Sequence, residues 1–104
     1  MSFRRYEILL PTRYNDGRAV EEEQFAETRR ELVAAFGAIT WSPEKLQGIW
    51  SQGGQVFEDV NLKVVIDVED TPEVRVFFRR FKQTLKTRFR QVEIWMVSYQ
   101  VEIY

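Results

Sequence analysis

The sequence has 104 residues, of which 44% are hydrophobic and 30% are charged, and its formal net charge is −1. This length and composition are those of one globular domain spanning residues 1–104, and they exclude an intrinsically disordered chain. The chain has no cysteine and no histidine, which excludes disulfide bonds, thiolate metal sites and catalysis by imidazole.

A strand, a polar loop and a helix are predicted in the first third of the chain. Tyr6, Ile8 and Leu10 alternate with more polar neighbours over a run that a proline ends, which is typical of a half-buried strand. Residues 12–18 form a polar loop with the turn sequence Asn-Asp-Gly. Residues 21–36 are predicted to be helical, because apolar residues recur at helical spacing and glutamates fill the first turn, where the helix dipole favours negative charge.

A β-hairpin is predicted next. A loop through Trp41 leads to a second strand from about Leu46 to Ser51. The glycine pair in Gln-Gly-Gly-Gln is typical of a tight turn, and the third strand begins near Val56. Apolar and more polar side chains alternate over residues 60–68, which predicts one buried face.

A second helix is predicted from Pro72 to about Gln91. Thr71 can cap its first amides, and a proline suits the first helical position. Its apolar stripe predicts that Phe78 and its neighbours Phe81 and Leu85 belong to the core. The segment carries seven basic residues and one acidic residue, a net charge of +6.

The last strand is predicted to be long, from Val92 to Ile103, with two unlike faces. One face carries Ile94 and Met96, and the other carries Trp95, Val97, Tyr99, Val101 and Ile103. The whole order, β-α-β-β-α-β, predicts an α+β, ferredoxin-like fold. We expect a four-stranded antiparallel sheet in the order 4-1-3-2, with both helices on one face. The other face is then bare, unless the chain around Trp41 folds over it.

Two candidate binding surfaces follow from this placement. The first combines the polar loop with aromatic side chains of the sheet. We place Trp50, Trp95, Tyr99 and Tyr104 on strands. The predicted ligand-binding residues of this surface are Tyr14, Asp16, Arg18, Trp50 and Trp95. The second is a basic helix face suited to phosphates, with Arg75, Arg79, Lys82, Lys86 and Arg90. The alternative for the basic residues is a solvated face whose charges pair with acids. Three acids, Asp67, Glu69 and Asp70, are interpreted as a solvated loop, so we predict no metal site and no cofactor.

Six short motifs follow one another along the chain. They are Tyr6-Glu7-Ile8-Leu9, Asn15-Asp16-Gly17, Phe36-Gly37, Gln47-Gly48-Ile49-Trp50, Pro72 to Lys82, and Phe89-Arg90-Gln91. Their order resembles uncharacterised families of small bacterial proteins. The resemblance covers nearly the whole chain, and it implies a small cytoplasmic domain with no assigned activity and no catalytic residues to transfer.

Three functions remain open from the sequence. The leading hypothesis is a non-enzymatic binding or assembly module that forms a homodimer, or a larger homo-oligomer, through its sheet, because a wide bare apolar face is costly in water. A second is a small cofactor-independent enzyme with a pocket between the sheet face and the loop at residues 12–18. A third is a phosphate or nucleic-acid binder that uses the basic helix, although a pI near 5.5 argues against nucleic acid. The first residues lack the apolar stretch of a signal peptide, and no run approaches the roughly 20 apolar residues of a membrane span, so we expect a cytoplasmic location and no membrane partner.

Overall fold

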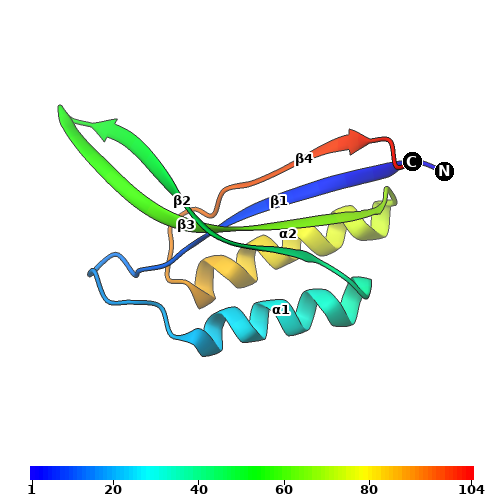
Figure 1. Ribbon diagram of the computed structural model, residues 1–104, viewed down its shortest axis with the longest axis horizontal. Coiled ribbons are helices and arrows are strands. Elements are labelled where there is room, and N and C mark those ends of the chain that lie inside the picture. Colours follow the sequence, from blue (N-terminus) through cyan, green and yellow to red (C-terminus); the bar gives the residue numbers. More distant parts are fainter.

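Six elements follow one another in the order that the sequence predicts (Figure 1). The computed structural model describes the backbone of all 104 residues and every side chain except those of residues 43 and 44. The elements are β1 (Phe3–Pro11), α1 (Glu22–Phe36), β2 (Thr40–Gln52), β3 (Gln55–Glu69), α2 (Pro72–Arg88) and β4 (Met96–Val101).

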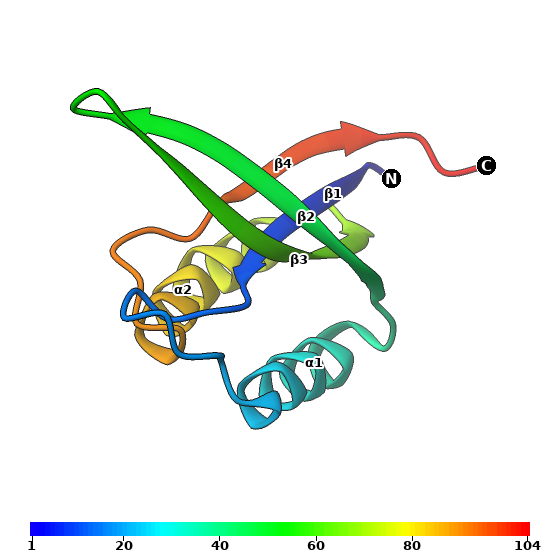
Figure 2. The ribbon, with the colours of Figure 1, turned by 60° about the vertical axis from the view of Figure 1, so that its left-hand side comes forward.

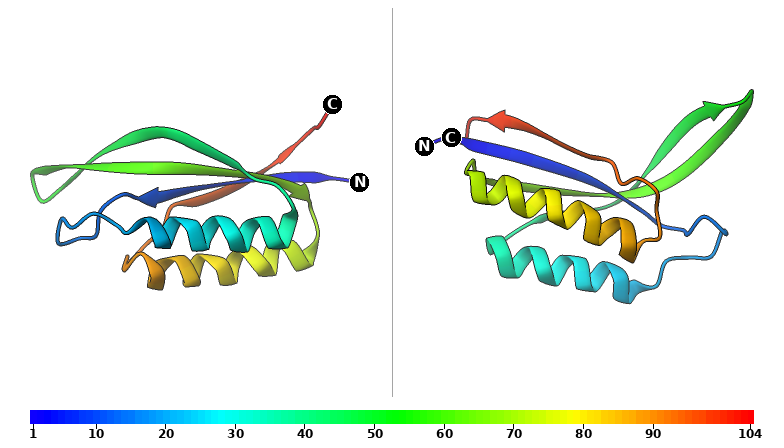
Figure 3. Two further views of the ribbon diagram at one scale, coloured as in Figure 1. Left: turned by 60° about the horizontal axis from the view of Figure 1, so that its bottom comes forward. Right: turned by 180° about the vertical axis from the view of Figure 1, so that it is seen from behind.

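The strands form one antiparallel sheet in the order β2-β3-β1-β4, which agrees with the expected order. Both helices lie against the same face of this sheet, and the other face is uncovered (Figure 3). One detail differs from four continuous strands. The register of the β2–β3 pairing shifts between Trp41 and Lys45, so β2 pairs with β3 in two segments.

The core lies between the sheet and the two helices. The buried residues of β1 are Tyr6, Ile8 and Leu10, which are the alternating set that the sequence predicts. Helix α2 contributes Phe78, Phe81 and Leu85, so their predicted place in the core is confirmed. The remaining buried apolar residues are Tyr14, Val20, Phe25, Leu32, Val64, Ile66, Val68, Phe89 and Ile94.

Trp41 belongs to the helical side of the sheet, so the idea that it folds over the bare face is wrong. Its ring meets that of Phe25 edge-on, with centroids 6.1 Å apart, and the guanidinium of Arg29 lies 4.7 Å from its ring centroid. Both partners are on α1. Trp41 also pairs with the buried Val64 of β3. The bare face therefore stays open within one chain.

Helix α2 begins as predicted but ends earlier than Gln91. Thr71 accepts a hydrogen bond on Oγ1 from the backbone N of Val74, 3.2 Å away, and a proline occupies the first turn. At the other end Arg90 has a φ of 55°, in the left-handed region. Its backbone N donates to the carbonyl of Thr87, and the next N donates to that of Lys86, which is the hydrogen-bond pattern of a Schellman cap. This cap stops the helix at Arg88.

The last strand is shorter than predicted at both ends, since β4 spans only Met96–Val101. Its pairing with β1 ends at Ile8–Met96, and a single further hydrogen bond joins the N of Leu9 to the carbonyl of Trp95. The chain before Met96 must return to the cap of α2, and Ile94 is buried there. Trp95 and Tyr104 are therefore not on a strand, contrary to the prediction.

The distal half of the β2–β3 hairpin projects from the body as an arm, which we define as residues 46–60 (Figure 1). Pairing between β1 and β3 ends at Pro11–Asn61, and the N and Oγ1 of Thr12 still donate to the carbonyl of Val60. Beyond Val60, β2 and β3 pair only with each other. The sequence predicted the hairpin but not its projection. Several of its large apolar side chains are exposed, namely Leu46, Ile49, Trp50, Val56, Phe57 and Val60. Among the described residues, no helix is long and apolar enough to span a membrane.

Asp70 ties the start of β1 to the start of α2, and it makes stability depend on pH. Its carboxylate accepts hydrogen bonds from Arg75 at 2.9 Å and from Arg4 at 3.2 Å, and its side chain is 6% exposed. The hydrogen bonds from Arg75, followed by those from Arg4, lower the pKa of Asp70 from 3.8 to about 2.

Because this pKa is lowered by folding, its contribution to stability is present above pH 3.8 and is lost as the pH falls from there to about 2. We expect Asp70→Asn to be less stable than the wild type at neutral pH, and the difference to shrink through that window. Urea unfolding at a series of pH values measures it, with Glu58→Gln on the arm as a control that removes an exposed carboxyl. If the stability difference between the wild type and Asp70→Asn stays constant down to about pH 2, the pKa of Asp70 is not lowered by folding.

Candidate ligand-binding cleft

A cleft of about 900 Å³ opens between the arm and the loop at residues 12–18. The arm and this loop lie at the same end of the molecule, away from the two chain termini (Figures 1 and 2). The segment between α2 and β4 forms the third side. The lining residues come from β1 and the loop (Leu9, Pro11, Thr12, Arg13, Tyr14, Asn15, Gly17), from β2 and β3 (Gln47, Trp50, Phe57, Glu58, Asp59, Val60, Asn61) and from the last connection (Gln91, Glu93, Ile94, Trp95).

The arm supplies an aromatic wall. The rings of Trp50 and Phe57, which are cross-strand partners, are stacked with centroids 4.4 Å apart. The indole N of Trp50 donates to the Oδ2 of Asp59 at 2.8 Å, which fixes the orientation of the indole. Trp50 is 43% exposed, and Trp95 on the connecting segment is 63% exposed. Flat apolar surfaces of this kind can stack on a planar ring.

At the loop end of the cleft lies a buried tyrosine whose ring carries two guanidinium groups, neither of them from a residue that lines the cleft. Tyr14 lines the cleft, and its hydroxyl donates a short hydrogen bond to the Oε2 of Glu21. The guanidinium of Arg90 lies 5.0 Å from the centroid of its ring, and that of Arg18 lies 5.3 Å away, within the range of cation–π contacts. The hydrogen bond with Glu21 raises the pKa of Tyr14, and it lowers the pKa of Glu21.

The turn in this loop explains why two predicted residues face elsewhere. Asp16 accepts hydrogen bonds from the backbone N of Arg18 at 3.0 Å and from its guanidinium at 2.7 Å, and these contacts lower the pKa of Asp16. Gly17, with a φ of 89°, lets the chain turn. Of the five residues predicted to bind a ligand, Tyr14, Trp50 and Trp95 line the cleft, whereas Asp16 and Arg18 pair with each other and do not line it.

Sequence reasoning missed several lining residues. Arg13 lies next to the predicted Tyr14, and its guanidinium donates to the carbonyl of Gly17 at 2.9 Å. Phe57 and Asp59 are brought to the cleft by cross-strand pairing with β2, which the register set by the predicted Gly-Gly turn would have revealed. Gln91 and Glu93 were assigned to the end of a helix and to a strand. No local signal marks them, because their position depends on how the chain returns from the cap of α2 to the sheet.

Four of the five basic residues predicted to bind anions make contacts within the chain. Arg75 pairs with Asp70, and Lys82 pairs with Glu93 at 2.9 Å. Arg79 donates to a backbone carbonyl of its own helix, and Arg90, at the far end, stacks on a tyrosine. Much of the predicted anion-binding set is thus engaged in separate structural contacts. Lys86, the fifth predicted residue, lies on the last turn of the helix.

The acidic cluster at the end of β3 is divided among ion pairs. Asp67 accepts two hydrogen bonds from Arg5, at 2.8 and 3.0 Å, and Asp70 is held by Arg4 and Arg75. In the part of the chain whose side chains are described, no group of three or more Asp and Glu residues could hold a metal ion.

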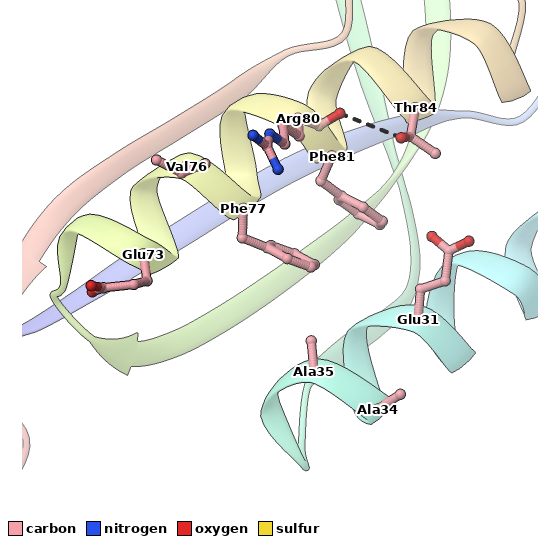
Figure 4. A pocket seen from close by; sticks show the side chains of 9 residues that line it. All are labelled: Glu31, Ala34, Ala35, Glu73, Val76, Phe77, Arg80, Phe81 and Thr84. Carbon is pink, nitrogen blue, oxygen red and sulfur yellow. Dashed lines mark hydrogen bonds between the residues drawn. The ribbon is translucent and has the colours of Figure 1, made fainter.

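A second hollow, of about 690 Å³, lies between α1 and α2 on the helical layer (Figure 4). Phe77 and Phe81 project from α2 toward the small side chains of Ala34 and Ala35 on α1, and charged side chains stand around them. It is an open, mostly apolar groove. None of the residues predicted to bind a ligand or an anion lines it.

Solved structures share the fold of this chain, among them the three that follow, whereas no protein-family model and no curated protein matches it. A phage SAM lyase in complex with S-methyl-5′-thioadenosine is 11% identical, covers 98% of this chain and 90% of its own, and has a TM-score of 0.69. The divalent cation tolerance protein (Cut A1) from Thermus thermophilus is 18% identical over 98% of this chain and 86% of its own, with a TM-score of 0.62. The B. subtilis GlnK–ATP complex is 18% identical over 96% of this chain and 82% of its own, with a TM-score of 0.54.

These likenesses establish the α+β fold with an antiparallel sheet and nothing more specific. The family resemblance drawn from the short motifs stays a prediction, because no family model matches. Enzymatic activity and the ligand of the cleft are likewise not decided by fold, since one fold supports many functions.

Proposed function

We propose that this protein is a binding module that associates with copies of itself through its sheet and its arm, and that binds a small ring-containing molecule in the cleft. The observation that carries the proposal is the exposed apolar arm. A two-stranded ribbon is marginally stable in water by itself. Ile49 and Val56, on the arm face that does not carry Trp50, are 67% and 69% exposed. A second copy that covers this face would stabilise the ribbon.

The bare sheet face supports the same proposal. At its centre, charges are neutralised within the sheet, since Arg5 pairs with Asp67 and Lys63 pairs with Glu7 at 2.8 Å. Tyr99, opposite Arg5 on β4, is 43% exposed on this face. A surface with internally paired charges and an apolar border can be buried against another protein without leaving unpaired ions. The predicted homodimer is one assembly that would bury it.

The cleft provides the binding part of the proposal. Exposed indoles on two of its sides and a guanidinium at its loop end suit a planar ring that carries polar groups. Two structures of the same fold hold molecules that contain an adenosine moiety, S-methyl-5′-thioadenosine and ATP. A nucleoside is therefore the ligand class that we propose. Tryptophan fluorescence during an adenosine titration tests it, and an unchanged spectrum at millimolar adenosine would contradict it.

We expect the wild type to sediment as an oligomer at micromolar concentration, and Tyr99→Glu to shift it toward a monomer near 12.5 kDa. The introduced carboxylate would lie opposite Arg5, whose guanidinium already pairs with Asp67, so a sheet-mediated interface would bury an excess negative charge, which weakens association by about tenfold or more. Gln100→Glu is the matched control, because it adds the same charge at the next position, where the side chain points to the opposite face. Sedimentation of the wild type as a monomer would contradict the assembly.

A small cofactor-independent enzyme is the second candidate, because the cleft lies where that alternative places its pocket, between the sheet face and the loop at residues 12–18. The acidic groups that line it are Glu58, Asp59 and Glu93. Asp59 accepts from the indole of Trp50, and Glu93 pairs with Lys82, which lowers the pKa of Glu93. The lowered pKa of Glu93 disfavours a role for this residue as general acid. Binding without turnover remains the leading proposal.

A further inference from the structure

Arg90 occupies a backbone position that favours glycine. It is the first residue beyond the cap of α2, where a left-handed residue completes the Schellman pattern, and its φ is 55°. A residue other than glycine is disfavoured in this left-handed conformation because its Cβ crowds the backbone. The chain nevertheless has an arginine at this position, and backbone outliers of this kind cluster at functional sites.

The guanidinium of Arg90 also lacks a carboxylate partner among the described side chains. Most arginines of the chain have one, namely Arg4, Arg5, Arg18, Arg29, Arg30, Arg75 and Arg88. Arg90 instead lies on the ring of Tyr14, with its guanidinium carbon 5.0 Å from the ring centroid. Tyr14 lines the cleft, and so does Gln91, the residue that follows Arg90.

A second guanidinium without a carboxylate partner among the described side chains lies at the same end of the cleft. Arg13 lines the cleft directly, and its guanidinium donates to a backbone carbonyl, that of Gly17 at 2.9 Å. The nearby acids are already occupied, since Asp16 holds Arg18 and Glu21 accepts from Tyr14. Two positive charges that no described carboxylate pairs with thus lie near the loop end of the cleft. Arg13 lines it, and Arg90 does not line it but lies on the ring of the lining residue Tyr14.

We infer that Arg90 and Arg13 form an anion-binding end of the cleft, which receives the phosphate of a ligand whose ring lies against the tryptophan side chains. This inference rests on the proposed function and specifies its ligand as a phosphorylated nucleoside. Guanidinium groups suit phosphate because they donate several hydrogen bonds in a planar, charged arrangement. Stacking on Tyr14 holds the guanidinium of Arg90 in place before the ligand arrives, which reduces the entropic cost of binding.

The test compares AMP with adenosine, which differ only in the phosphate, by titrating tryptophan fluorescence. We expect the wild type to bind AMP about tenfold more tightly than adenosine, as a charge-assisted contact predicts. Arg90→Gly should lose about that factor for AMP and keep its affinity for adenosine within about twofold. Since glycine relieves the left-handed backbone, the variant should melt no lower than the wild type, so a loss of binding will not reflect unfolding.

Arg80→Ala is the matched control, because it removes an arginine of α2 that also has no ion pair among the described side chains and that lies at the groove between the helices. It should leave both affinities unchanged. Equal binding of AMP and adenosine by the wild type, or unchanged AMP binding in Arg90→Gly, would overturn the inference while leaving the proposed nucleoside site intact.

If neither nucleoside changes the fluorescence, the proposed ligand class is wrong, and inorganic pyrophosphate then decides the inference separately. A melting temperature that rises in pyrophosphate, relative to chloride at equal ionic strength, and that rises less in Arg90→Gly, supports the anion site. No rise in the wild type overturns it.

Discussion

Phe78→Ala is expected to lower the free energy of unfolding by about 3–5 kcal/mol, the largest loss that we predict for a single substitution. Phe78 is 1% exposed, and its ring stacks on that of Tyr6 with centroids 3.7 Å apart and on that of Phe36 at 5.3 Å. Removing it would leave a cavity between α2, β1 and α1 that the rigid neighbouring rings cannot fill. Urea denaturation at fixed protein concentration measures the loss.

Val76→Ala is the control on the same helix. Val76 is exposed and is only two residues from Phe78, so its truncation removes little buried surface. We expect a change within about 0.5 kcal/mol. A loss below about 1 kcal/mol for Phe78→Ala would mean that the aromatic stack is loosely packed.

Arg88→Ala is expected to cost about 2–3 kcal/mol, the second largest effect. Its guanidinium reaches from the end of α2 to α1, where it donates to the Oγ1 of Thr28 at 2.9 Å and to the Oε1 of Glu31 at 2.6 Å. Its side chain is 11% exposed, and Thr28 is fully buried. Truncation would leave Glu31 without its counter-charge. Because Glu31 is partly solvated, the cost stays below that of breaking a fully buried pair.

The contribution of the charge can be separated from that of packing by Arg88→Met, which keeps much of the apolar volume. We expect it to recover part of the stability that Arg88→Ala loses, because the stem of Arg88 packs between the helices. Arg30→Ala, which removes an exposed arginine paired within α1, is the control and should change stability by no more than about 0.5 kcal/mol. Equal losses at the two positions would show that the inter-helix contact adds nothing.

Local chemistry in the sequence determined which elements form. The alternation of Tyr6, Ile8 and Leu10 predicted β1 and its buried face, since side chains alternate along a strand whatever its surroundings. Thr71 predicted the start of α2 in the same way, because a capping hydrogen bond spans only a few residues. The order of these elements, with the right-handed connections that parallel crossovers require, then predicted the order of the strands.

Only the tertiary structure decided where the candidate site lies and which residues border it. Tyr14 and Trp50 are far apart in the sequence, and they meet at one cleft because the arm projects beyond the last residue of β1. The last strand begins at Met96 rather than Val92, and α2 ends at Arg88, since the chain between them must bury Ile94 and return to the sheet. A strand ends where the neighbouring strand no longer offers backbone groups for hydrogen bonds. The alternation of residues along one strand does not show where that point lies.

The backbone of Arg90 illustrates the same limit. Its residue type predicts an ordinary solvated cation on a basic helix, whereas its left-handed conformation and its place on the ring of Tyr14 follow from how α2 ends against the loop. Composition and pattern thus determined an α+β domain with two helices on one side of an antiparallel sheet. The packing of segments distant in the sequence decided the arm, the cleft and the cationic end of the cleft, because each depends on contacts that form only when the chain is folded.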